Sequence, residues 1–141
     1  MIIKCIAADD EPLALDIIKD YISRVPFLKL MKTFNDGMSV VEYLSSNTCD
    51  LMFLDIEMGG LTGTQLLKTL PKKPMVIMTT AYRKYAADAF DLDVTDYLLK
   101  PFSFERFLKA VEKSCTLMKK GQKEQSPAAE SKEYFFVKSG Y

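Results

Sequence analysis

Acidic side chains gather directly after an apolar run near the start of the chain. In "CIAADDEP" the apolar part gives way to Asp9, Asp10 and Glu11, and a second apolar run, "LMFL", is followed by Asp55. Adjacent like charges repel one another unless a carboxyl keeps a proton or a cation lies among them. Oxygen ligands without nitrogen or sulfur suit Mg2+, which keeps some of its waters and often contacts a phosphate. These carboxylates therefore indicate a site for a divalent cation.

Two more apolar runs end in residues that suit an anionic group. "MVIMTT" ends with Thr79 and Thr80 and is followed by Ala81, and "DYLL" is followed by Lys100. An aspartate can attack phosphorus and form an acyl phosphate, and phosphoryl transfer depends mainly on positioning and charge neutralisation. We take Asp55 as the candidate nucleophile, with Lys100 to neutralise the phosphoryl oxygens and Thr80 to donate a hydrogen bond. Ala81 leaves room for the group. Taken singly, each residue fits a helix cap, a turn or a solvated side chain, so only their joint placement favours a site.

Short apolar runs alternate with segments of helical periodicity along the chain. The runs that predict strands are residues 2–8, 28–34, 51–54, 75–79 and 95–99, and the segments that predict helices are residues 12–24, 36–46, 63–70, 82–91 and 103–118. This alternation predicts an α/β fold in which helices cover both faces of a parallel sheet. Right-handed crossovers favour a flavodoxin-like, doubly wound sheet of five strands in the order 2-1-3-4-5.

The predicted strand order gathers the candidate residues at one edge of the sheet. Ligands of such folds bind at the carboxyl ends of the strands, where the strand order reverses, and here that point falls between the first and third strands. Asp9 and Asp10 follow the first strand, and Asp55 follows the third. The fold therefore predicts that these three carboxylates lie together, although they are distant in sequence.

The composition excludes several kinds of site. The 141 residues suit one compact domain, and 19 basic residues balance 19 acidic ones, so no overall charge favours nucleic acid or a membrane surface. The absence of histidine rules out a Ser-His-Asp triad, and three cysteines without a CxxC pair argue against zinc. The apolar start does not fit a signal peptide, and no run approaches the length of a membrane span. We expect a reduced, soluble, cytoplasmic protein.

The composition changes after residue 118. Residues 119–132, "KKGQKEQSPAAESK", are polar and include Gly and Pro, which predicts a linker after a folded domain of residues 1–118. Residues 133–141, "EYFFVKSGY", contain three adjacent apolar residues. A single strand formed by this segment at the chain end would have no neighbouring strand to pair with. This segment either folds back on the domain or frays, or it is the first strand of a second domain. We favour the second domain, because a linker precedes the segment.

Four motifs together resemble the receiver domain of bacterial two-component response regulators. They are "ADDEP", "FLDIEMGGLTG", "TTAY" and "DYLLKPF", in the order and spacing of that family, over residues 2–118. The resemblance implies a CheY-like fold in which a sensor histidine kinase phosphorylates Asp55 with Mg2+ as the cofactor. It also implies that Asp55 and Asp10 bind Mg2+ directly. Glu57 would bind Mg2+ through its backbone carbonyl, and Asp9 would do so through a water molecule.

The same resemblance implies a conformational switch. Thr80 and Tyr97 resemble the family's switch pair, and Lys100 resembles the lysine that bonds the phosphoryl group, with Lys100–Pro101 as a cis peptide. Phosphorylation would draw Thr80 toward the phosphoryl group and let Tyr97 turn inward. The face formed by residues 82–91, the fifth strand and the last helix would then become a homodimer surface. Such a domain is no enzyme beyond self-catalysed phosphorylation and dephosphorylation.

The motifs and the tail also resemble one subfamily of these regulators. "TTAY", "DYLLKPF" and a linker followed by "YFFVKSGY" resemble regulators with a LytTR-type (LytR/AlgR-like) DNA-binding output domain. Residues 133–141 would then be the start of that domain, and DNA would be bound by its remainder and not by this chain. Two positions depart from the family pattern. Gly59 replaces the usual Pro, which predicts a looser loop, and Asp93 replaces a Gly, where aspartate tolerates the left-handed conformation.

Three other classes of protein use parts of this pattern. A Mg2+-dependent phosphatase of the haloacid-dehalogenase kind also has an aspartyl nucleophile, but its DxD motif follows the first strand, whereas "DIE" follows the third here. A flavin-binding flavodoxin needs a Ser/Thr-rich phosphate loop after the first strand, where "DDEP" would repel a phosphate. A receiver-like scaffold that is never phosphorylated would not need the complete set of acids, threonine and lysine.

Overall fold

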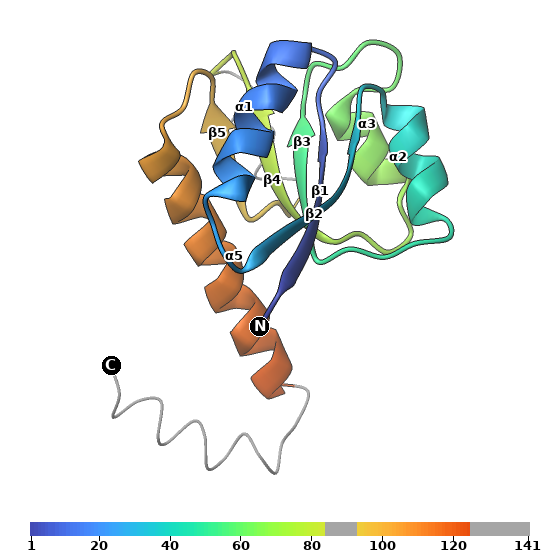
Figure 1. Ribbon diagram of the computed structural model, residues 1–141. Coiled ribbons are helices and arrows are strands. Elements are labelled where there is room, and N and C mark those ends of the chain that lie inside the picture. The colour runs from blue at the N-terminus through green and yellow to red at the C-terminus, as the bar shows by residue number, and fades with distance from the viewer. Residues whose placement is uncertain (84–92, 125–141) are drawn as a thin grey trace.

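A five-stranded parallel sheet forms the middle of the protein (Figure 1). The computed structural model describes residues 1–83 and 93–124. The strands are β1 (Ile3–Ala8), β2 (Leu28–Phe34), β3 (Leu51–Asp55), β4 (Met75–Thr80) and β5 (Asp96–Leu99). They lie in the order β2-β1-β3-β4-β5, and each neighbouring pair is parallel, which confirms the predicted topology.

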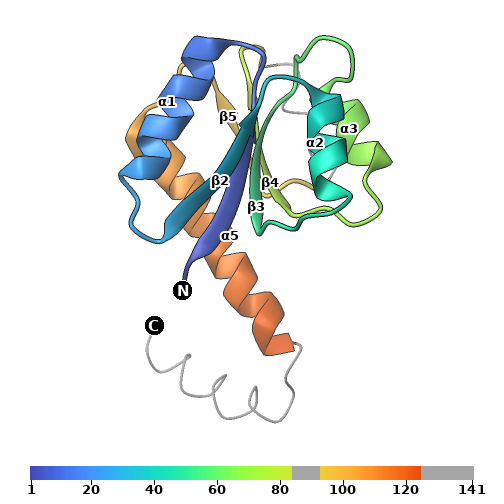
Figure 2. The ribbon, with the colours of Figure 1, turned by 45° about the vertical axis from the view of Figure 1, so that its right-hand side comes forward.

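Helices cover both faces of this sheet, as predicted. The helices α1 (Pro12–Ser23) and α5 (Phe104–Glu124) lie on one face, and α2 (Gly37–Leu44) and α3 (Gly63–Thr69) lie on the other (Figure 2). The two faces are called the α1–α5 face and the α2–α3 face below. Within residues 1–83 and 93–124, every helix is too short or too polar to cross a membrane.

Local sequence signals define where the helices start. Pro12 occupies the first turn of α1, where the missing N–H costs nothing. The Asp36 side chain accepts a hydrogen bond of 2.8 Å from the Ser39 N–H and caps α2. Thr62 and Gln65 form a capping box at the start of α3, in which each side chain bonds the other residue's backbone N–H. These caps place the helix starts next to the carboxyl ends of the preceding strands.

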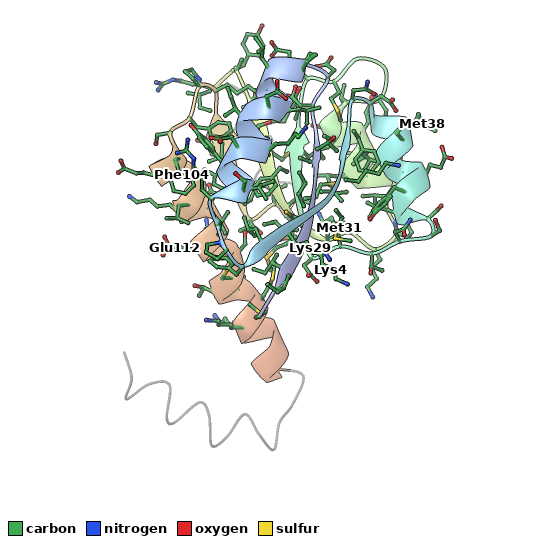
Figure 3. All side chains as sticks on the ribbon, viewed as in Figure 1. Lys4, Lys29, Met31, Met38, Phe104 and Glu112 are labelled. Carbon is green, nitrogen blue, oxygen red and sulfur yellow. The ribbon has the colours of Figure 1, made fainter. Side chains whose placement is uncertain are left out.

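Apolar side chains fill two cores, one on each face of the sheet. All five residues of β3 are buried, so this central strand contributes to both. On the α1–α5 face, the ring of Phe53 stacks on Phe107 of α5 with their centroids 5.1 Å apart. Phe104, at the start of α5, packs edge-on against Tyr21 of α1 at 5.5 Å (Figure 3). On the α2–α3 face, Leu54 belongs to a core shared with both of those helices.

The last helix is longer than predicted. Residues 119–124, for which the composition predicts the start of a linker, continue α5 to Glu124. Lysine, glutamine and glutamate are good helix formers, and one glycine costs a helix only about 1 kcal/mol, so polarity alone did not mark the helix end. Other predictions match: Asp93 has a positive φ of 55°, as its tolerance of the left-handed region suggested. Most of the helix predicted over residues 82–91, and the tail segment 133–141, fall outside the described residues.

Truncation of the central aromatic contact should destabilise the fold strongly. Phe107 is fully buried between Phe53 and Tyr21, so Phe107→Ala removes a large apolar side chain and leaves a cavity. We expect a loss of about 3–5 kcal/mol in the free energy of unfolding, measured by urea denaturation. Leu13→Ala is the matched control, because Leu13 is 75% exposed on α1 and should change stability by less than about 0.5 kcal/mol. Equal losses for the two variants would contradict this account of the core.

Candidate functional site

Three carboxylates meet at the carboxyl edge of the sheet. Asp9 follows β1, Asp55 ends β3, and the two strands are direct neighbours with Ala8 opposite Leu54. One carboxylate oxygen from each of Asp9, Asp10 and Asp55 lies within 4.8 Å of the others. Asp9 and Asp55 are buried, whereas Asp10 is exposed. The predicted juxtaposition is therefore confirmed, and its geometry suits a small cation that keeps part of its water shell.

One ammonium group contacts these acids. The Nζ atom of Lys100 lies 2.8 Å from Asp9 Oδ2, 3.5 Å from Asp55 Oδ1 and 3.9 Å from Glu11 Oε1. Its side chain is only 17% exposed. Lys100 follows β5 directly, and its backbone N–H donates to the backbone carbonyl of Thr80. The Lys100–Pro101 peptide is cis, as the sequence motif suggested. Because Lys100 follows β5, its side chain reaches past the end of β4 and places its positive charge at the ends of β1 and β3.

The buried charges shift one another's pKa. Burial raises the pKa of Asp55 to about 7, and the negative charge of Asp9 adds to this rise, while the charge of Lys100 opposes it. Burial alone would lower the pKa of Lys100. Its hydrogen bond to Asp9 and the charge of Asp55 outweigh that effect, so the pKa is raised and the amine stays charged. Without a further cation, the site is therefore over-negative and Asp55 is poised to take up a proton.

The side chain of Glu57 has a contact that the sequence did not reveal. The hydroxyl of Thr80 donates to Glu57 Oε1, and the Ala81 N–H donates to the same oxygen at 3.3 Å. The Tyr82 N–H donates to the hydroxyl oxygen of Thr80 at 3.0 Å. The resemblance to receiver domains implied only a backbone role for Glu57. Its position two residues after Asp55, at the same sheet edge, was the one signal that its carboxylate could reach the end of β4.

Two threonines end β4, and they point to opposite faces. Thr80 is bonded as described, whereas the hydroxyl oxygen of Thr79 is buried without a hydrogen-bond partner among the described residues. Tyr97 of β5 lies opposite Met78 of β4 and packs, half-buried, against the core of the α2–α3 face. Tyr97 thus lies on the strand next to that of Thr80, and the role of the two residues as a switch pair stays a prediction.

Glycines shape the loop that follows Asp55. A Cβ on Gly63, at the start of α3, would lie 2.5 Å from the backbone oxygen of Asp55, so the helix packs directly against the end of β3. Gly60 has a positive φ of 76°, which favours glycine. Gly59 has open space around its Cα, and its N–H donates to Asp10 Oδ2 at 3.3 Å. The predicted looseness of this loop stays a prediction.

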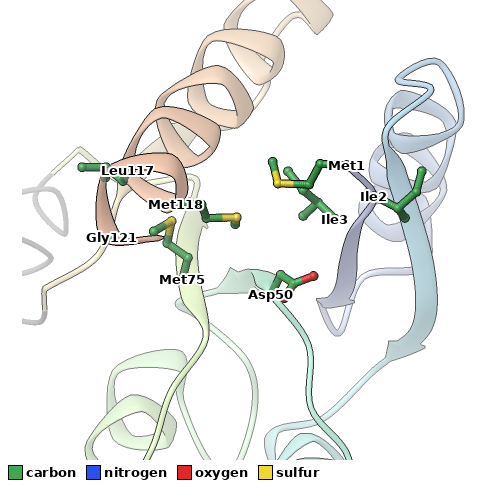
Figure 4. Close-up of a pocket in the computed structure, with 8 residues that line it drawn as sticks. All are labelled: Met1, Ile2, Ile3, Asp50, Met75, Leu117, Met118 and Gly121. Carbon is green, nitrogen blue, oxygen red and sulfur yellow. The ribbon is translucent and has the colours of Figure 1, made fainter. Parts of the chain in front are cut away.

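A hollow at the other end of the molecule is separate from this site. It measures about 340 Å³ and lies at the amino-terminal edge of the sheet, between the first residues of the chain and the end of α5 (Figure 4). Its lining is mainly apolar and includes Met1, Met75 and Met118, with Asp50 at one side. It shares no residue with the carboxylates or Lys100, so it takes no part in the chemistry of the charged edge.

The doubly wound sheet and the acid–lysine edge define a receiver domain. The chain matches the family model of the response regulator receiver domain over residues 5–112 and belongs to that family. Among its relatives, the transcriptional regulatory protein YpdB of Escherichia coli is 32% identical over 129 residues, covering 89% of this chain and 53% of the relative. The sensory transduction protein LytR of Staphylococcus haemolyticus is 35% identical over 113 residues, covering 78% and 44%. The chain thus spans about half the length of these relatives.

Solved structures agree with the fold. The response regulatory domain of protein MrkE from Klebsiella pneumoniae has 31% sequence identity and a TM-score of 0.76, and the match covers 83% of this chain and 98% of that one. RcsB from Salmonella enterica, bound to a promoter in the presence of the phosphomimetic BeF3−, has 21% identity and a TM-score of 0.70, covering 78% and 58%. The relatives of LytR, LytT, YpdB and MrkE type confirm the subfamily that the motifs resembled.

The raised pKa of Asp55 predicts how stability depends on pH in the absence of metal. The folded protein keeps the Asp55 proton up to a pH of about 7, whereas the unfolded chain releases it near its usual value of about 3.9. The folded state then binds more protons between these values, so this group makes stability fall as pH rises through that window. With a chelator present, Asp55→Asn should therefore melt at a higher temperature than wild type near about pH 8.

The advantage of Asp55→Asn should shrink as the pH is lowered to about 4, because the folded protein then keeps the Asp55 proton and the unfolded chain begins to bind it as well. Thermal melts at a series of pH values provide the measurement. Asp16→Asn, which removes an exposed carboxylate from α1, is the matched control and should show no comparable pH-dependent advantage. A constant difference between Asp55→Asn and wild type across the series would refute the assigned shift.

Proposed function

We propose that this chain is a phosphorylation-controlled switch in which Asp55 accepts a phosphoryl group from a sensor histidine kinase. The observation that carries the proposal is the placement of a buried aspartate 3.5 Å from a half-buried lysine, within a group of three carboxylates. Asp55 would attack the phosphorus atom with a carboxylate oxygen and form an acyl phosphate, while the kinase histidine leaves. Lys100 would neutralise one phosphoryl oxygen, and the hydroxyl of Thr80 would donate to another. Ala81 offers the group little steric obstruction.

The cofactor in this proposal is Mg2+. Asp10 and Asp55 would bind the ion directly, the backbone carbonyl of Glu57 would be a further ligand, and Asp9 would act through water. The clustering of carboxylate oxygens within 4.8 Å supports this set, and a divalent cation would offset the negative charge that raises the pKa of Asp55. Held by these residues, the ion would supply positive charge that favours the ionised, nucleophilic form of Asp55 and offsets the charge of the incoming phosphate.

The output of the switch is proposed to be dimerisation and control of transcription. Phosphorylation would shift Thr80 toward the phosphoryl group and let Tyr97 turn inward, and the face that includes β5 and α5 would then pair with a second copy. A relative named as a transcriptional regulatory protein and one named as a sensory transduction protein are each about twice the length of this chain, which leaves room for a DNA-binding domain after it. Residues 133–141 would begin that LytTR-type domain. The balanced charge of this chain supports DNA binding outside it.

Phosphorylation of Asp55 can be tested directly by mass. Incubation with Mg2+ and acetyl phosphate should add one phosphoryl group to the wild type, because the site needs only a donor, a cation and an ionised aspartate. Asp55→Asn should gain none, and a chelator should abolish the gain in wild type. Asp20→Asn removes an exposed α1 carboxylate and should be modified like wild type. A phosphoryl group on the Asp55→Asn variant would count against the proposal. So would a wild type that gains no phosphoryl group and also binds beryllofluoride poorly.

The route from Asp55 to the dimer surface can be tested at Tyr97. Tyr97→Ala removes the ring that would respond to Thr80, so Asp55 should still be phosphorylated while phosphorylation no longer promotes dimerisation. Sedimentation with and without beryllofluoride measures this. Tyr43→Ala is the matched control, since Tyr43 is a half-buried tyrosine on α2 that packs against the same core but lies away from β5. Unchanged beryllofluoride-dependent dimerisation of Tyr97→Ala would argue against Tyr97 as the link.

A further inference from the structure

One ion pair holds the backbone of Tyr97. Arg106 of α5 binds Asp96 of β5 in a forked arrangement, Nη1 to Oδ2 and Nη2 to Oδ1, each at 3.0 Å. Nη2 also donates to the carbonyl oxygen of Tyr97 at 3.0 Å. The Tyr97 N–H in turn donates to Asp96 Oδ1 at 2.8 Å. The ion pair therefore contacts both main-chain polar groups of the residue that the switch is proposed to move.

The pair differs from an ordinary surface contact. The Asp96 side chain is 15% exposed and that of Arg106 is 42% exposed, whereas Arg24 and Asp20 pair on α1 with more than half of each side chain exposed. Burial works to raise the pKa of Asp96, yet the hydrogen bonds from Arg106 and from the Tyr97 N–H lower it overall. Forked arginine–carboxylate contacts fix direction as well as distance, which a single surface contact does not.

The location of Arg106 connects this ion pair to the phosphoryl site. Arg106 lies in the first turn of α5, where its own N–H donates to the hydroxyl oxygen of Ser103 at 3.1 Å. The loop between β5 and α5 contains Lys100, whose ammonium group contacts Asp9 and Asp55. The strand and the helix lie side by side (Figure 1), and the ion pair links the first residue of β5 to the first turn of α5, so it spans the segment that carries the lysine.

We propose that Arg106 is a positioning residue for the switch. By holding the backbone of Tyr97 and linking the start of β5 to the first turn of α5, it confines the Tyr97 response to the side chain and pre-organises the segment that carries Lys100 for the phosphoryl group. Lys100, Tyr97 and the start of α5 then move as one connected unit, and a change at Asp55 reaches the α5 surface without being absorbed by the loop. This inference rests on the proposed function of Asp55 and assigns Arg106 a role that the phosphoryl chemistry itself does not require.

The test separates positioning from simple stabilisation. Tyrosines of the full chain are replaced by 3-fluorotyrosine, and the Tyr97 signal in the 19F NMR spectrum is assigned with Tyr97→Phe. Beryllofluoride with Mg2+ is the probe that loads Asp55. In wild type, saturation should move the Tyr97 signal to a new position. In Arg106→Ala, we expect a smaller movement at saturation and an apparent beryllofluoride affinity roughly 2- to 30-fold weaker, because loop order must be recovered on binding.

Two further variants sharpen the comparison. Arg106→Lys keeps the charge but not the forked contact, so its Tyr97 response should resemble that of Arg106→Ala. Arg24→Ala removes the exposed α1 pair and should leave both the Tyr97 response and the affinity at wild-type values. If Arg106→Ala does not fold, Asp96→Asn tests the same contact, since it neutralises the carboxylate that orients Arg106, and its Tyr97 response should also be reduced.

The outcomes distinguish this inference from the proposed function. A folded Arg106→Ala with the full Tyr97 movement and wild-type affinity would overturn the inference, because a merely structural ion pair would lower only the melting temperature. The same result in Asp96→Asn would overturn it too. A wild-type Tyr97 signal that does not move while Asp55 is loaded would also overturn it. Failure of wild type to load Asp55 at all would instead overturn the proposed function, and the inference would fall with it.

Discussion

Two buried aspartates share the carboxyl edge of the sheet with the half-buried ammonium group of Lys100. Lys100 lies 2.8 Å from Asp9 and 3.5 Å from Asp55, and its one charge cannot balance both carboxylates and the nearby Asp10. Burial, together with the negative charge of Asp9, raises the pKa of Asp55 to about 7. A buried group in this condition responds strongly to any added charge, whether a proton, a cation or a phosphoryl group, because the surroundings screen it weakly. The rest of the fold serves to hold these charges at this distance.

The parallel sheet provides that placement. Because β1, β3 and β4 end at one edge and the long side chain of Lys100 reaches it from the end of β5, four chain segments meet there. The close approach of Gly63 to the backbone of Asp55 anchors the following loop at its far end. On the other side, the contact of Thr80 and Ala81 with Glu57 ties the end of β4 to the same loop. Each strand end is thus held by at least one neighbour, which keeps the charges from relaxing apart.

The response of the charged sheet edge to an added charge becomes a signal only if another part of the molecule changes with it. β5 and α5 are suited to this, since the loop between them carries Lys100 and the ion pair of Asp96 with Arg106 links the start of β5 to the first turn of α5. Tyr97 has its backbone held by this pair and its ring on the α2–α3 core, so it contacts both layers of the fold. Packed elements of this kind have few alternative arrangements, and a small change at one end is therefore passed on and not dissipated.

Much of this protein was determined by its sequence alone. The apolar runs and helical periodicities predicted the five parallel strands in order, because burial on both faces requires continuous apolar strands, and the order in turn predicted that Asp9, Asp10 and Asp55 meet. The left-handed conformation of Asp93 also followed from local preference. What only the tertiary structure decided were contacts between side chains far apart in sequence: Glu57 with Thr80, and Arg106 with Asp96 and Tyr97. The end of α5 belongs with these, because polar helix formers read equally as linker or as an exposed helix that continues past the sheet. Local patterns record burial and backbone preference, whereas the partner of a polar side chain depends on which strand ends the folded sheet brings together.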